Sequence, residues 1–276
     1  MTFLAIKIAF TTIIVLGLSV LAERCGPRLA GILMGAPLGA LVSYFFIGQE
    51  AGPEYVAAGT PFAAAGMTGT LIFTYVYYRA SVWLTSWPPL WNALAATFTG
   101  MLAYLIFTAM IKNYPLTIIS ALFIVTPAIF IGAFLFRKFV DVKIIDPPQL
   151  TFKLLLIRAS GAAFFVSVIS SLAVELGPTW GGLLIAFPMT LLPTMLIIHL
   201  SYSKEHVQAM LSAFPIGLGS VIVYIVVIGE TFPRYGITMG TICALVAAWA
   251  YLILLPFGCK LARHFKKLRI CSSTSD

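Results

Sequence analysis

Residues 26–41 read GPRLAGILMGAPLGAL, and residues 177–192, at a constant offset of 151 positions, read GPTWGGLLIAFPMTLL. Both stretches carry the pattern GP-x3-G-x5-P, and between Gly26 and Gly66 the two halves of the chain agree at 11 of 41 positions. Glycine and proline are unfavourable in helix interiors, so chance explains their recurrence at identical spacing poorly. The pattern indicates an internal repeat.

The composition around this repeat is that of a membrane protein. Hydrophobic residues make up 61% of the 276 residues and charged residues only 9%, against about 45–50% and about 25% in soluble domains. A mean hydropathy of +1.02 spread over the whole chain leaves no segment of ~100 residues for a separate soluble domain. We therefore expect an all-α, polytopic membrane helical bundle.

About 20 apolar residues cross a ~30 Å hydrocarbon core as a helix. Nine segments are long enough: 3–22, 29–48, 56–78, 91–111, 115–136, 154–174, 180–200, 207–228 and 237–257. The mixed-charge segment 137–153 separates a first unit, 1–136, from a second repeat, 154–260, and a basic tail, 261–276. Whether a tenth membrane segment exists is left open.

The positions of the basic residues predict the orientation. With the N-terminus outside, 14 of the 17 Lys and Arg residues face the cytoplasm, as the positive-inside rule requires. The net charge of +8 is thereby assigned to cytoplasmic loops and not to nucleic-acid binding. We expect a multi-pass protein of the inner (cytoplasmic) membrane, with a cytoplasmic C-terminus and the lipid bilayer as its surroundings. A homodimer stays open.

The span count also sets the relation between the repeats. The repeat covers spans 1–4 and 6–9, and the unpaired fifth span turns the second copy upside down in the membrane. Inverted repeats of this kind are common in secondary transporters, where two halves expose one midplane site to each side in turn. The alternative is gene duplication in a protein that only serves as a scaffold.

Matching Gly/Pro-interrupted spans are the best sequence indicator of a transporter site, because proline frees a backbone carbonyl one turn earlier. In spans 2 and 7 the freed carbonyls are those of Leu33 and Leu184. The candidate substrate-binding residues of these spans are Gly35, Pro37, Gly39, Pro188, Thr190, Pro193 and Thr194; spans 3 and 8 add Thr68, Gly217 and Ser220. The alternative is that these residues only permit close packing and kinks, and that the hydroxyls bond their own helices.

All nine acidic residues fall in loops, at span ends or in the tail, so we expect neither an enzyme nor a catalytic residue. Four single cysteines and no His/Cys cluster predict no metal and no cofactor. The candidates for gating or coupling are Glu23 and Glu175, beside the two GP motifs, with Arg158 and His199 near span ends. Surface capping is the alternative for the two acids, and snorkelling to the interface for Arg158.

The GP-x3-G-x5-P repeat resembles that of a group of uncharacterised bacterial integral membrane proteins, to which the small GlpM-like membrane proteins are similar. The overall plan resembles the drug/metabolite transporter superfamily, with two inverted five-helix halves, although the second half here has four spans. The resemblance implies export or exchange of small organic solutes. We therefore expect a secondary transporter or exporter of a small neutral or amphipathic organic solute. The alternatives are a non-catalytic scaffold or accessory subunit of an envelope biosynthesis system, and a flippase for an amphipathic or lipid-linked molecule.

Overall fold

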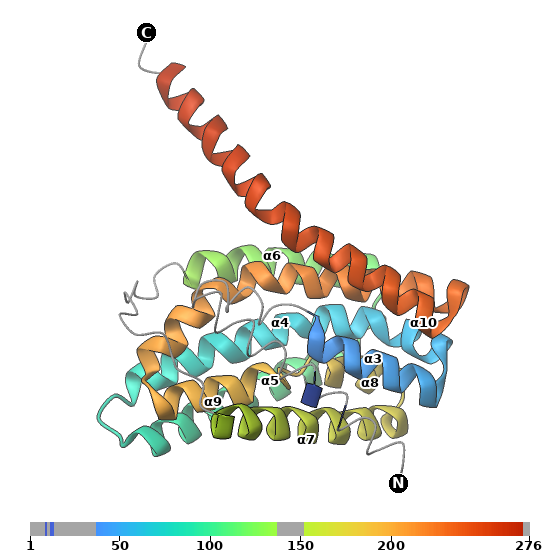
Figure 1. Ribbon diagram of the computed structural model, residues 1–276, viewed down its shortest axis with the longest axis horizontal. Coiled ribbons are helices and arrows are strands. Elements are labelled where there is room, and N and C mark those ends of the chain that lie inside the picture. The colour runs from blue at the N-terminus through green and yellow to red at the C-terminus, as the bar shows by residue number, and fades with distance from the viewer. Residues whose placement is uncertain (1–8, 10–11, 14–36, 137–151, 273–276) are drawn as a thin grey trace.

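The computed structural model describes residues 37–136 and 152–272, together with residues 9, 12 and 13. These parts of the chain contain helices and no strand (Figure 1). The helices are α3 (Leu38–Ala51), α4 (Pro53–Trp83), α5 (Pro89–Ile111), α6 (Ile118–Phe136), α7 (Phe152–Leu176), α8 (Pro178–Ile185), α9 (Leu191–Ser201) and α10 (Lys204–Ser272). Nearly all of the predicted span 3–22 and of the connector 137–153 lies outside the described residues.

Four of these helices, α4, α5, α6 and α10 over Lys204–Leu255, are long and apolar enough to cross a membrane. Large apolar side chains cover the outer faces of α5 and α6, as shown by Phe98 and Phe123, which are 69% and 76% exposed. A continuous apolar surface of this kind is unfavourable in water and suited to lipid chains. The expectation of a membrane-embedded helical bundle is confirmed.

Three predicted spans differ in the structure from separate, continuous helices. The segment 180–200 forms two helices, α8 and α9, separated at 186–190, because Pro188 has no N–H for an intrahelical hydrogen bond. The segments 207–228 and 237–257 both belong to α10, which Gly236 divides by a backbone conformation of φ 75° and ψ 176°. A positive φ is open to glycine and strained for other residues. We call 204–235 the first arm of α10 and 237–272 the second arm.

Helix α4 lies at the centre of the bundle and packs against α5, α6, α8 and α10. A run of small residues, including Gly59, Ala63 and Gly66, lets the neighbouring backbones approach closely. The closest approach is to α8, where a Cβ added to Gly182 would lie 2.1 Å from the carbonyl oxygen of Gly59. Glycine is therefore required at this crossing.

Helix bounds in the two halves agree at the sequence offset of 151. Adding 151 to the bounds of α4, 53–83, gives 204–234, and the first arm of α10 covers 204–235. Adding 151 to 38–51 gives 189–202, and α9 covers Leu191–Ser201. The first arm of α10 runs antiparallel to α4, because Thr60 near the start of α4 meets Gly229 near the end of the arm, whereas Leu71 and Pro215 both contact Gly132.

Candidate functional site

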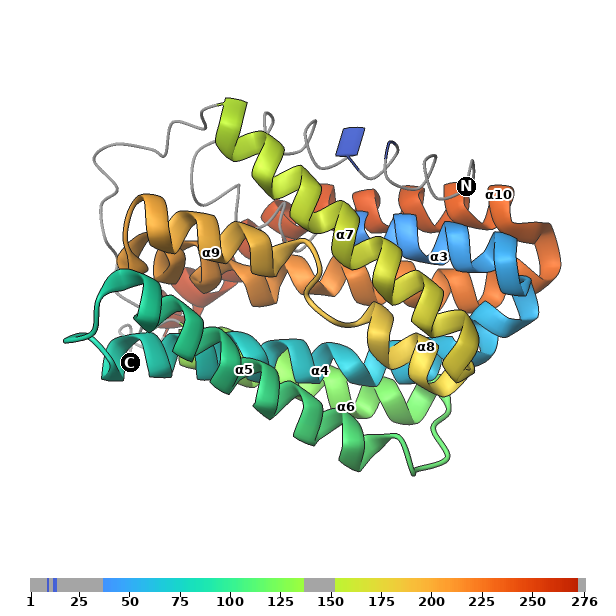
Figure 2. The same cartoon turned by 90° about the horizontal axis from the view of Figure 1, so that it is seen from below.

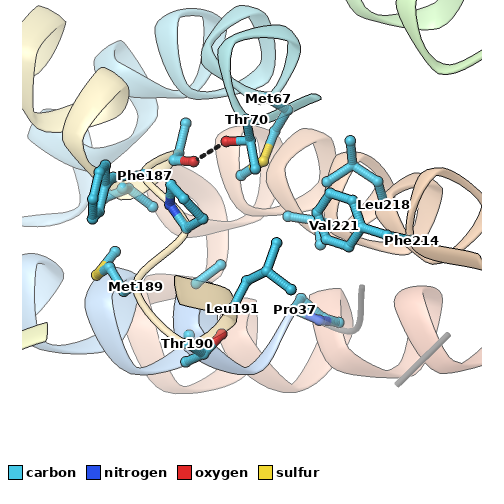
Figure 3. Close-up of a pocket in the computed structure, with 15 residues that line it drawn as sticks. Pro37, Met67, Thr70, Phe187, Met189, Thr190, Leu191, Phe214, Leu218 and Val221 are labelled. Carbon is cyan, nitrogen blue, oxygen red and sulfur yellow. Dashed lines mark hydrogen bonds between the residues drawn. The ribbon is translucent and has the colours of Figure 1, made fainter. Parts of the chain in front are cut away.

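A cavity lies where the start of α3 meets the break between α8 and α9 (Figure 3). Its volume is about 50 Å³, and it is bordered by Phe187 and Met189 on one side and by Phe214 and Leu218 on the other. The 15 lining residues are Pro37, Gly39, Ala40, Met67, Thr70, Ile185, Ala186, Phe187, Pro188, Met189, Thr190, Leu191, Phe214, Leu218 and Val221. Within the part of the chain that the structure describes, this lining includes no acidic, basic or histidine residue and contributes no charge.

Helices α3 and α9 both begin at this cavity and run away from it in opposite directions (Figure 2). At their starts, a Cβ added to Gly39 would lie 3.1 Å from Cγ2 of Thr190. Helix α3 ends at Ala51, next to the start of α4 at Pro53, whereas His199, near the end of α9, contacts Tyr77 toward the end of α4. The first turn of each helix has N–H groups without intrahelical acceptors, so two positive dipole ends face the cavity.

Ten of the 15 lining residues form pairs whose two members lie 151 positions apart in the sequence. Five pairs of positions 151 apart line the same cavity: Pro37 with Pro188, Gly39 with Thr190, Ala40 with Leu191, Met67 with Leu218, and Thr70 with Val221. Both halves of the chain thus contribute matching positions to one central space.

The break between α8 and α9 is stabilised by side chains of the first half. The hydroxyl of Thr70 donates to the carbonyl of Ala186, and the hydroxyl of Tyr104 donates to that of Leu183. The carbonyl of Leu184, which the sequence predicts to be free, accepts a hydrogen bond of 3.1 Å from the N–H of Phe187 in a tight turn. These bonds fix the end of α8, so the cavity gains its polarity from helix N-termini and hydroxyls rather than from this carbonyl.

Four of the ten predicted substrate-binding residues line the cavity, namely Pro37, Gly39, Pro188 and Thr190. Thr194 and Ser220 instead donate to the carbonyls of Thr190 and Gly217 in their own helices, at 2.8 and 2.9 Å. Helix-facing hydroxyls are a common fate in apolar surroundings. Three other predicted residues do not line the cavity. Pro193 contacts Gly161, Gly217 is buried, and Thr68 is half-buried with an Oγ1 that has no hydrogen-bond partner among the described residues. Gly35 lies outside the described residues.

None of the predicted gating residues that the structure describes lines this cavity. Glu175 is exposed at the end of α7. His199 is buried, and its Nδ1 lies 2.7 Å from the hydroxyl oxygen of Tyr77. Glu23 and the side chain of Arg158, a residue of α7, lie outside the described part of the chain.

Sequence reasoning missed the apolar wall of the cavity. Phe214, Leu218 and Val221 follow one another at spacings of four and three, and Met67 and Thr70 at three, so each set occupies one face of its helix. In spans that are apolar on every side, this periodicity does not distinguish the face that lines a cavity from the other faces. The repeat offset is the signal that could have found them, because Met67 pairs with Leu218.

No family model, no curated protein and no solved structure matches this chain. Within residues 37–136 and 152–272, no group of three or more His, Cys, Asp or Glu side chains is placed to hold a metal ion. The functional argument therefore depends on the geometry of the cavity.

Proposed function

We propose that the protein is a secondary transporter that moves a small neutral or amphipathic organic solute by alternating access of two inverted repeats. The observation that carries the proposal is one cavity at which α3 and α9 both begin, lined by five pairs of positions 151 apart. Paired discontinuous helices that meet at mid-membrane are typical of transporter binding sites. The antiparallel course of α4 and the first arm of α10 supports inversion of the second repeat.

The size of the cavity favours a state without bound substrate. A buried water needs ~10–15 Å³, so about 50 Å³ holds only a few waters and no organic solute. Binding therefore requires the start of α3 or of α9 to move away from the other. Because the two helices run toward opposite ends of α4, their separate movements would open the cavity to opposite sides of the membrane.

The lining chemistry favours a substrate without net charge. Met, Phe, Leu, Ile and Val side chains supply most of the wall, and a buried charge would have no counter-ion among the lining residues. The two helix starts and the hydroxyl of Thr190 offer hydrogen bonds to a polar group of the solute. A molecule with a large apolar part fits best, which keeps a flippase for an amphipathic molecule as a variant of the same proposal.

The proposed topology has nine membrane helices in the inner membrane, with the N-terminus outside and the C-terminus in the cytoplasm. Its support is the 14 of 17 basic residues that this arrangement places on the cytoplasmic side. Reporter fusions within 137–153 and at the C-terminus should both report the cytoplasm, and reporters on opposite sides would contradict the nine-helix topology.

Side-specific labelling separates a transporter from a scaffold. In a variant with Cys25, Cys243, Cys259 and Cys271 replaced by serine, a single Val221→Cys reporter is treated with a membrane-impermeant maleimide in right-side-out and inside-out vesicles. Alternating access predicts labelling from both sides, because both states are populated.

The matched control is Phe98→Cys on the lipid-facing surface of α5, which we expect to stay unlabelled from either side. Labelling of Val221→Cys from one side only, or from neither, would overturn alternating access, and the second result would favour the scaffold.

A further inference from the structure

A second cavity, of about 210 Å³, lies at the far end of α9 from the central cavity. The 11 residues of α9 separate the two by about 16 Å. Figure 2 shows the end of α9 and the α4–α5 connection on the same side of the bundle. The lining residues are Thr85, Trp87, Pro89, Asn92, His199, Leu200, Tyr202, Ser203, Lys204 and Glu205.

Two buried polar side chains line this cavity. Asn92 is 3% exposed, and its Nδ2 donates to the carbonyls of Ser81 and Leu84 at 2.9 and 2.7 Å. These bonds fix the amide, whose buried Oδ1 has no partner among the described residues. His199 is 5% exposed and uses Nδ1 toward Tyr77. Both side chains shape the wall of the cavity, whereas the carboxylate of Glu205, in a side chain 41% exposed, is an acceptor that a ligand can reach.

Charges of both signs stand beside these groups. The Nζ of Lys204 donates to Oγ1 of Thr85 at 2.9 Å and lies 4.0 Å from a carboxylate oxygen of Glu205. Helix α5 begins at Pro89 and α10 at Lys204, so two helix N-termini add positive potential. The combination suits a ligand that carries an anionic group and an ammonium group together.

The corresponding place at the other end of the bundle lacks this polar set. At the offset of 151, His199 corresponds to Gly48 and Asn92 to Cys243. A Cβ on Gly48 would meet the side chains of Phe232 and Ile237 at 3.2 Å, so that end is filled by apolar packing. Among the described residues, the equivalent positions at that end therefore lack the histidine and the amide that line the second cavity.

The depth of the cavity points to the kind of anionic group. Trp83, Trp87 and Trp91 are 90%, 48% and 60% exposed around the α4–α5 connection. Exposed tryptophans sit at the headgroup level of a bilayer, where phosphate is the common anion. A volume of about 210 Å³ is below the ~300–1,000 Å³ of drug-sized sites and suits a headgroup-sized ligand.

We propose that this cavity binds a small zwitterion that joins a phosphate to a primary ammonium group, either as a lipid headgroup or as a free molecule. The phosphate lies at Lys204 and the start of α10, and the ammonium group donates to the carboxylate of Glu205. The proposal does not rest on transport, because it concerns binding at a separate cavity.

The test is a calorimetric titration of the full chain in nanodiscs of phosphatidylglycerol, which has no ammonium group. O-phosphoethanolamine should bind at least about tenfold more tightly than phosphocholine, whose ammonium has no N–H to donate, and than inorganic phosphate. Equal binding of O-phosphoethanolamine and phosphocholine, or no binding of either, would overturn the proposal.

Variants locate the site. Glu205→Gln and Lys204→Gln should each weaken binding of O-phosphoethanolamine about tenfold. The matched control is Glu54→Gln, because Glu54 occupies the equivalent place in the first turn of α4 at the other end of the bundle. Glu205 has a side chain 41% exposed, so its variant should fold normally, and an unchanged elution volume and melting midpoint verify this. Equal effects of Glu54→Gln and Glu205→Gln would place the ligand elsewhere.

The same titration in a second lipid distinguishes a lipid headgroup from a free molecule as the source of the ligand. Nanodiscs that contain phosphatidylethanolamine should abolish binding of free O-phosphoethanolamine if the headgroup fills the cavity. Undiminished binding assigns the cavity to a free molecule. In either case the ligand joins a phosphate to a primary ammonium group. Titration of the Glu205→Gln variant in both kinds of nanodisc verifies that the ligand binds at this cavity.

Discussion

A disulfide between Gly39→Cys and Thr190→Cys should hold the starts of α3 and α9 together and close the central cavity. A Cβ placed on Gly39 lies 3.9 Å from Cβ of Thr190, within the ~3.5–4.5 Å range of disulfides and next to their mean of ~3.8 Å. The bond allows the two Cβ atoms to separate by only about 0.6 Å more. Cysteine at position 190 also removes the Cγ2 that lies 3.1 Å from the new Cβ, so the double variant should be better packed than Gly39→Cys alone.

The assay combines oxidation with the Val221→Cys reporter in the background without native cysteines. Oxidation should abolish labelling from both vesicle orientations, in proportion to the cross-linked fraction, and a reductant should restore it. The double variant Gly39→Ser/Thr190→Ser has nearly the same volume and cannot oxidise, so its labelling should not respond to either treatment.

Two results would refute the reasoning. Failure to cross-link under strong oxidation would mean that the starts of α3 and α9 do not meet. Complete cross-linking with undiminished labelling of Val221→Cys would mean that the cavity opens without separation of these helices, and alternating access about this junction would be wrong.

Three further substitutions test the packing around the cavity. Pro188→Ala should let the helix continue across 186–190 and reduce labelling of the reporter without preventing membrane insertion; unchanged labelling would remove the break from the mechanism. Gly182→Ala should lower the free energy of unfolding by about 3 kcal/mol or more, because its Cβ would overlap the carbonyl oxygen of Gly59. The control Gly132→Ala, whose Cβ would have its nearest contact at 3.5 Å, should change the melting midpoint in detergent little. Tyr104→Phe should lower stability by about 1 kcal/mol in the same assay through loss of its hydrogen bond to α8, and an unchanged midpoint would show that this bond is not stabilising.

The sequence predicts the place of the central cavity because its signal is local. Pro188 lies in the break between α8 and α9, Pro37 directly precedes α3, and the recurrence of the GP-x3-G-x5-P pattern marks the two prolines as a pair. The structure places both prolines at one cavity. Pro61 and Pro127 lie inside continuous helices, so the repeated pattern carries the signal and a proline alone does not.

The rest of the site depends on tertiary contacts that have no local signal. Met67 and Phe214 cannot be told from other apolar residues in uniformly apolar spans, and the direction of Thr194 depends on competition between its own helix and the cavity. Asn92 escaped notice because a single amide at the start of a span is ordinary at an interface. Its importance depends on residues more than 100 positions later, in α9 and α10, that close the second cavity.

The close crossing of α8 over α4 holds α8 in place, whereas α9, on the other side of the break at 186–190, is not part of this crossing. Backbone contact at Gly59 and Gly182, with the hydroxyls of Thr70 and Tyr104, anchors α8, so bending at 186–190 moves α9. With an arm of about 16 Å, a rotation of about 10° displaces the far end of α9 by about 3 Å. His199 is at that end, so a small rearrangement at the central cavity is amplified at the second one. If α9 moves as the proposed transport requires, a ligand in the second cavity would restrict that movement.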